Sequence, residues 1–276
     1  TGSMSDELRF LQAELDAIVA SLNARHPDLD IRVGMTFFRD KGDEFVTRTY
    51  PFTGDAQQAR GQLARQYAAG GGDYDLSKLD GRPCFAGLDL ASTTDITALV
   101  LVFDMEDHYF ILPFFWIPAG NAQRRLHEDR IPYPEWIERG LIESTPGTVT
   151  DYDYIRNRIN ELGKIYNIKE IAIDRWNATQ LAVQLGQDGF EVNFFGQGMR
   201  SMAAPTKELE ALVLSEKIAH AGHPVLRWMA ANTSVERDAA DNRKPSKKSS
   251  TEKIDGIVAT IMALSRLQQD EDGGPS

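Results

Sequence analysis

The amino-acid sequence predicts an α/β protein in which helices flank a mixed β-sheet, preceded by a small, incomplete α/β segment. Three apolar segments between residues 84 and 116 favour antiparallel strands, and strand patterns then alternate with helical ones. The three consecutive glycines at 70–72 divide the chain, because such a run loses too much backbone entropy to lie inside a helix or strand. We therefore predict two units, residues 1–75 and 76–276.

Composition narrows the possible function classes. The 276 residues are 42% apolar with a single cysteine, which excludes a disulfide framework and suits a reducing, cytoplasmic compartment. No apolar run approaches the ~20 residues of a membrane span, and the first residues lack the form of a signal peptide. The net charge of −11 disfavours a non-specific nucleic-acid binder. Nucleic-acid binding would have to rest on a local basic patch or on bound metal.

The first unit shows the pattern helix, strand, strand, helix. Apolar residues recur at helical spacing over residues 5–24, which predicts an amphipathic helix. Residues 31–38 and 44–50 are typical of strands, and residues 55–68 of a second helix. A sheet of two strands leaves apolar strand edges without partners, so we expect this unit to pack weakly.

The second unit opens with strands at residues 84–90, 97–103 and 109–116, close enough in sequence to pair antiparallel. Helices and strands then alternate. The predicted elements are helices 121–129 and 151–166, strand 170–174, helix 177–188, strand 191–195, and helices 205–216 and 224–231.

A basic loop at residues 241–250 leads to the last helix. Ser249 and Glu252 have the spacing of a capping box and are expected to open this helix. Its core face carries Ile254, Ile257, Val258, Ile261 and Leu264.

Asp89, Asp174 and Asp255 each interrupt an apolar segment. A carboxylate beside core residues loses hydration, and several converging carboxylates repel one another. A hard divalent cation such as Mg²⁺ removes both costs, because it prefers carboxylate oxygen. Taken singly, each aspartate could instead cap a helix or form a turn. Asp95 is a fourth candidate, for which capping a turn is an equal alternative.

Five basic residues form the second signal. Because they lead directly into the helix that carries Asp255, they favour contact with phosphate, although a run of charges can also be a solvated loop. They are Arg243, Lys244, Lys247, Lys248 and Lys253. The sequence contains no Gly-x-x-x-x-Gly-Lys-Ser/Thr phosphate loop, so we expect no ATP site in this chain.

A family resemblance rests on several segments that occur in order over about residues 76–267. They are residues 87–95 (GLDLASTTD), 97–103 (TALVLVF), 112–116 (LPFFW), 174–178 (DRWNA), 205–210 (PTKELE), 224–229 (PVLRWM) and 253–259 (KIDGIVA). Together they resemble the nuclease domain of tailed-phage terminase large subunits.

This resemblance implies an RNase H-like fold and a metal-dependent endonuclease that cuts concatemeric double-stranded DNA in the host cytoplasm. It implies two Mg²⁺ or Mn²⁺ ions held by Asp89, Asp174 and Asp255, which are the catalytic residues, and a DNA backbone held by the basic residues of 243–253. The implied partners are the terminase small subunit and the portal. A full large subunit also carries a packaging ATPase, which we do not find in this chain.

Residues 1–73 resemble part of a von Willebrand factor A-like domain instead. The segments concerned are residues 1–7 (TGSMSDE), 29–34 (LDIRVG), 38–40 (FRD) and 70–73 (GGGD). Of that family's metal site, Ser3, Ser5 and Asp73 could remain, without the main acid. Two alternatives to a terminase nuclease follow: a metal-dependent protein-interaction module built on this unit, or another RNase H-like enzyme such as a resolvase or transposase.

Overall fold

The computed structural model describes residues 33–38, 47–53, 74–90, 96–122, 131–175 and 178–271, together with positions 21, 24 and 25. The helices predicted at 5–24, 55–68 and 121–129 lie wholly or largely outside the described residues. Ser3, Ser5, Asp73 and Asp95 also lie outside them. Both strands predicted in the first unit are present, as β1 (Val33–Phe38) and β2 (Thr47–Thr53), and they pair antiparallel.

The central sheet is mixed, with the strand order β6-β5-β4-β3-β7-β8. As predicted, β3 (Pro83–Asp89), β4 (Thr97–Asp104) and β5 (Tyr109–Pro118) form an antiparallel meander. β7 (Asn167–Asp174) then joins β3 in parallel, and β8 (Val192–Phe195) joins β7 in parallel. The parallel half of the sheet therefore starts beside β3, at its centre.

Two further short strands lie beside β5 that the sequence did not predict. β6 (Glu143–Thr145) and β9 (Ile218–Ala219) both run parallel to it. Segments of two or three residues are too short to display the alternation that marks a strand.

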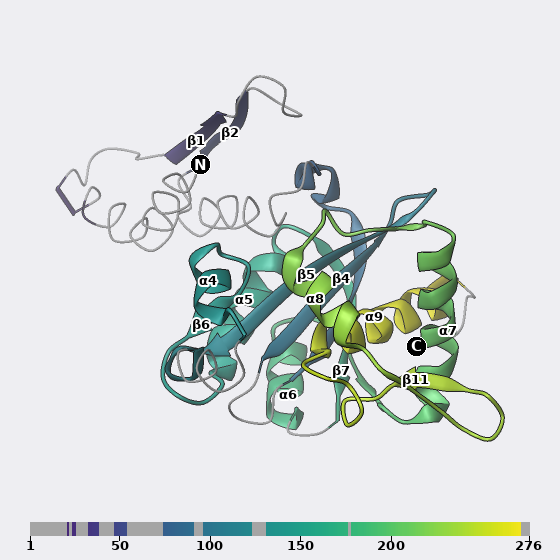
Figure 1. Ribbon diagram of the computed structural model, residues 1–276. Helices are drawn as coiled ribbons and strands as arrows, with labels where there is room; N and C mark the ends of the chain where they lie inside the picture. The colour runs from purple at the N-terminus through teal and green to yellow at the C-terminus, as the bar shows by residue number, and fades with distance from the viewer. Residues whose placement is uncertain are drawn as a thin grey trace.

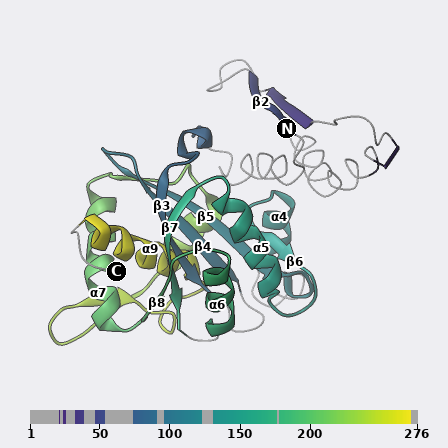
Figure 2. The ribbon, with the colours of Figure 1, turned by 180° about the vertical axis from the view of Figure 1, so that it is seen from behind.

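Helices cover both faces of the sheet (Figures 1 and 2). On one face, α5 (Tyr152–Gly163) and α6 (Thr179–Gln187) pack against leucines of β3 and β4, in one continuous core. The opposite face is covered by α4 (Tyr133–Glu138), α8 (Pro224–Asn232) and α9 (Asp255–Glu271). The central strands are buried on both sides, which explains their unbroken apolar sequences. None of the helices in the described residues is long and apolar enough to span a membrane.

α7 (Met199–Leu214) begins six residues before the predicted start at Pro205. The sequence pattern placed this proline in the first helical turn, where its missing N–H costs nothing. The helix instead passes through Pro205, which is buried. The helical turn before Pro205 is held by Met202, which packs in a core cluster with residues of α9. The sequence pattern does not reveal this contact.

Residues 241–250 are a loop as predicted except at 243–245, which form a short strand, and the predicted start of the last helix was wrong. The start of the basic segment belongs to a hairpin, in which β10 (Val235–Arg237) pairs antiparallel with β11 (Arg243–Pro245). α9 begins only at Asp255. Ser249 does not cap it, because its backbone N–H and its hydroxyl group both bond to Ser246 within a separate turn. Local spacing could not distinguish a cap from this turn.

Candidate metal centre

Asp89 and Asp174 end two neighbouring parallel strands. Leu88 of β3 lies opposite Ile173 of β7, and each acid follows this pair by one residue. Parallel strands present equivalent positions side by side, so both carboxylates leave the same edge of the sheet from adjacent strands. Asp89 is only 1% exposed, whereas Asp174 is partly exposed.

Asp255 reaches this edge because α9 lies very close to β3. A Cβ atom on Gly87 would stand 1.9 Å from the carbonyl oxygen of Ala259, so only glycine permits the observed contact. Asp255 precedes Ala259 by about one helical turn, and Asp89 follows Gly87 by two strand residues. The close packing of backbone on backbone therefore fixes the two acids relative to each other.

Lys247 joins Asp89 to Asp255. Its Nζ atom lies 2.6 Å from Oδ2 of Asp89 and 2.9 Å from Oδ1 of Asp255. These two oxygens are consequently no farther apart than the sum of those distances. Burial acts to lower the pKa of Lys247, but the two carboxylates outweigh it and raise this pKa, so the group stays an ammonium ion. One cation thus compensates two acids, both of them buried.

Gln197 is a part of the site that the sequence did not indicate. Its Nε2 donates a hydrogen bond to Oδ1 of Asp89 at 2.9 Å, on the oxygen that Lys247 does not hold. Gln197 lies in the short connection from β8 to α7, which leaves the sheet at the same edge as Asp174. The only local signal is its position between Gly196 and Gly198, directly after a strand.

The donor set has the right chemistry for a hard divalent cation. Carboxylate oxygen is the preferred ligand of Mg²⁺, and the oxygens of Asp89 and Asp255 already surround a positive charge. Among the described residues, no three Asp, Glu, His or Cys side chains are arranged so that they could hold an ion. In this arrangement it is the ammonium group of Lys247 that lies between the two acids.

Two of the other four predicted basic residues form ion pairs with acids. Arg243 pairs with Glu210 at 3.1 Å and with Asp241 at 3.4 Å. Lys244 pairs with Glu236 at 2.7 Å. Lys248 is exposed, and Lys253 is partly exposed. The structure thus brings one of the five predicted DNA-contacting residues, Lys247, into the acidic site itself.

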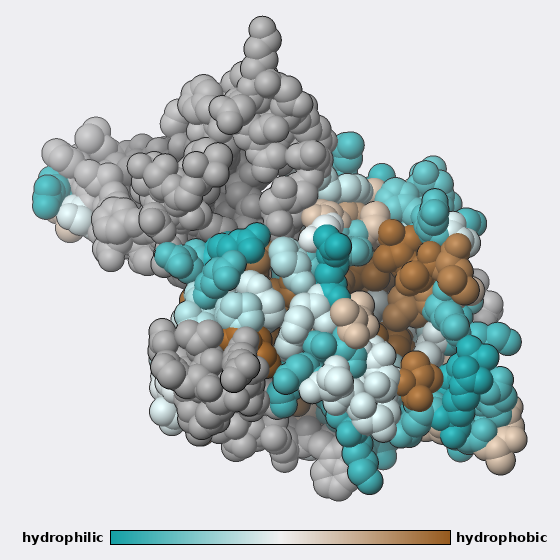
Figure 3. All heavy atoms as spheres, viewed as in Figure 1, coloured by the Kyte–Doolittle hydropathy of each residue, from teal (hydrophilic) through white to brown (hydrophobic). Residues whose placement is uncertain are grey.

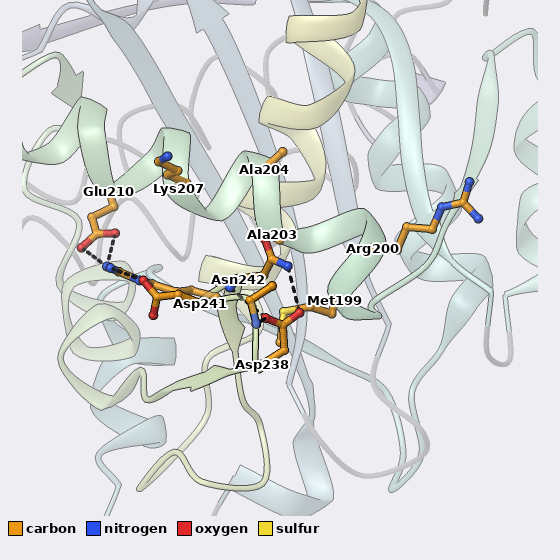
Figure 4. Close-up of a pocket in the computed structure, with 11 residues that line it drawn as sticks. Met199, Arg200, Ala203, Ala204, Lys207, Glu210, Asp238, Asp241 and Asn242 are labelled. Carbon is orange, nitrogen blue, oxygen red and sulfur yellow. Dashed lines mark hydrogen bonds and ion pairs between the residues drawn. The ribbon is translucent and has the colours of Figure 1, made fainter.

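A groove of about 800 Å³ lies between α7 and the β10–β11 hairpin. In the space-filling view, hydrophilic residues predominate at the lower right, where Figure 1 shows β11 (Figure 3). In the close-up, Glu210 and Asp241 lie on opposite walls, and Asp238 points toward Asn242 (Figure 4). None of the residues lining the groove is one of the three predicted acids. The groove therefore adjoins basic residues of the hairpin but is not the acidic site.

A known protein family matches most of the chain. Residues 63–271 match the family described as the terminase large subunit, endonuclease domain. The chain belongs to this family. The terminase large subunit of Enterobacteria phage HK97 is 36% identical over 198 residues, which are 70% of this chain and 39% of that protein. Protein YmfN of Escherichia coli (strain K12) is 32% identical over 214 residues, 71% of this chain and 46% of that protein. The chain spans less than half the length of these two relatives.

The crystal structure of the HK97 bacteriophage large terminase matches with a TM-score of 0.65 and 29% identity, over 91% of this chain and 50% of that one. The fold is that of an RNase H-like terminase nuclease domain, as the sequence predicted. The magnesium-bound terminase nuclease of phage G20c is more distant, at 14% identity and a TM-score of 0.46 over 68% of this chain and 84% of that one. The resemblance of residues 1–73 to a von Willebrand factor A-like domain stays a prediction.

Proposed function

We propose that this terminase nuclease domain cuts concatemeric double-stranded DNA by divalent-metal-dependent hydrolysis of a phosphodiester, with Asp89, Asp174 and Asp255 as its metal ligands and catalytic residues. The observation that carries the proposal is the meeting of Asp89 and Asp255 at one cation, beside the end of β7. Asp89 and Asp255 share one ammonium group, and Asp174 ends the neighbouring strand. The three carboxylates carry more negative charge than Lys247 neutralises, and this favours divalent cations.

Each residue would have a defined part in the reaction. When bound, two Mg²⁺ or Mn²⁺ ions would stabilise the attacking and leaving oxygens of an in-line displacement. Asp89 and Asp174 would hold their carboxylates on rigid strands, and Asp255 would complete the set from α9. Gln197 would keep the carboxylate of Asp89 in one orientation through its amide hydrogen bond.

The DNA backbone would be held by Arg243, Lys244, Lys247, Lys248 and Lys253. Arg243 and Lys244 would release their acidic partners to bind phosphate groups. Lys248 is exposed and could contact phosphate directly. By family, the terminase small subunit and the portal are the proposed partners, in the cytoplasm of the host cell. The division into residues 1–75 and 76–276 belongs to the same proposal.

The test is cleavage of supercoiled plasmid by the purified chain. We expect nicking and linearisation with Mg²⁺ or Mn²⁺, none with chelator, and loss of cleavage in Asp89→Asn and Asp255→Asn. Asp270→Asn is the matched control, because it removes an exposed carboxylate from the same helix as Asp255. Full cleavage by Asp89→Asn would refute the assignment of the site. A strong preference for branched junctions over linear duplex would favour a resolvase-type activity instead.

A further inference from the structure

The position of Lys247 has a consequence for metal binding itself. We propose that the ammonium group of Lys247 competes with the divalent cation for Asp89 and Asp255, so that Lys247 must leave these carboxylates before the metal site can be completed. This inference rests on the proposed function, because it assumes that the two aspartates are metal ligands. It concerns a step that precedes cleavage and does not require DNA.

The distances make the two occupants mutually exclusive. Nζ of Lys247 lies 2.6 and 2.9 Å from one oxygen of each aspartate. A Mg²⁺ ion bound to the same oxygens would stand about 2.1 Å from each, and therefore within a few ångström of the ammonium group. The ammonium has three donors and no lone pair, so it cannot become a metal ligand. Repulsion between the two cations excludes joint occupancy of that position.

Lys247 is also the member of this trio that is able to move. Its side chain is 44% exposed, while those of Asp89 and Asp255 are 1% and 12% exposed. Lys247 lies in a turn between β11 and α9, whereas the acids belong to a central strand and to a helix packed on it. The buried Ser246 anchors the turn through bonds to Ser249 and Ser250. The lysine side chain can thus swing into solvent while the backbone keeps its place.

Displacement of Lys247 would connect metal loading to DNA binding. A phosphate group at the site offers the released ammonium an alternative anionic partner. DNA would then favour metal binding, and metal would favour DNA binding to the same degree, as linkage requires. Without DNA, Lys247 would hold the paired carboxylates in a compensated and inactive state.

The experiment measures Mn²⁺ binding to the DNA-free chain, by the loss of the electron paramagnetic resonance signal of free Mn²⁺. Lys247→Met removes the competing charge and keeps an unbranched side chain that is only one atom shorter. We expect it to bind Mn²⁺ about tenfold more tightly than wild type, within the usual range of coupling between sites. Lys247→Arg retains a cation and should stay near wild type. Lys217→Met, which removes a positive charge from an exposed position, should not change the affinity.

Each outcome of this titration decides the inference. Tighter binding in Lys247→Met alone supports competition, even where wild type binds too weakly to measure. Equal or weaker binding in Lys247→Met overturns it, as does an equal gain in Lys217→Met. The proposed function is judged separately by plasmid cleavage: a wild type that cleaves, with an unchanged Mn²⁺ affinity in Lys247→Met, would remove the competition and leave the nuclease site intact.

Discussion

Replacing Gly87 by alanine would test whether the packing of α9 on β3 builds the site. The new Cβ would stand 1.9 Å from the carbonyl oxygen of Ala259, 2.8 Å from its carbonyl carbon and 3.0 Å from the backbone nitrogen of Ala263. All three are backbone atoms, so no side chain can rotate out of the way. Ordinary contact begins at 3.4 Å, and raising 1.9 Å to that value moves α9 about 1.5 Å away from the sheet.

Two effects of different size should follow. Overpacking costs about 1–3 kcal/mol of unfolding free energy, which corresponds to a melting temperature lower by several degrees in a domain of this size. The retreat of α9 also carries Asp255 away from Asp89. Because a displacement of about 1 Å can reduce catalysis roughly 100-fold, we expect Mn²⁺ binding and plasmid nicking to fall much more than stability does.

Urea unfolding, Mn²⁺ titration and plasmid nicking are measured on the same preparation of Gly87→Ala. Gly186→Ala is the matched control, because its added Cβ in α6 meets nothing within 4 Å beyond its chain neighbours and the backbone of its own helix. Alanine at that helical position should be neutral or stabilising by up to about 1 kcal/mol. A Gly87→Ala protein with the stability and metal affinity of wild type would show that the α9–β3 contact does not position the acids.

Two further predictions concern Gln197 and His223. Gln197→Leu removes the amide donor to Asp89 and should weaken Mn²⁺ binding or slow nicking by roughly 10- to 100-fold at nearly constant stability; an unchanged affinity and rate would argue against a positioning role. Burial, with smaller contributions from His220 and Arg139, lowers the pKa of His223 to about 3. Between pH 6.5 and 3 the imidazole is protonated in the unfolded chain but neutral in the folded one. The unfolded state therefore binds more protons, and the free energy of unfolding decreases as the pH falls through this range, by about 2 kcal/mol at pH 5. His223→Asn keeps an acceptor at this helix N-cap, and its urea-unfolding free energy should decrease less than that of wild type between pH 7 and 5; parallel losses in both proteins would contradict the assignment.

The sequence by itself determined the elements whose pattern is local and long. The strands β3, β4 and β5 were predicted because each is an unbroken apolar run, and their short connections required antiparallel pairing. It also marked Asp89, Asp174 and Asp255 as exceptional, because a charged residue inside an apolar segment is visible without a structure. Family resemblance added the fold and the expected chemistry.

Only the tertiary structure decided which groups meet at the end of β3. Lys247 is 158 residues away from Asp89 in sequence, and Gln197 is 108 residues away, so no local pattern relates them. The turn at Ser249 and the β10–β11 hairpin likewise depend on partners that spacing does not reveal. Side-chain spacing reports the period of a helix or strand, whereas contact between a lysine and two buried acids depends on how close α9 can approach the sheet, which Gly87 controls.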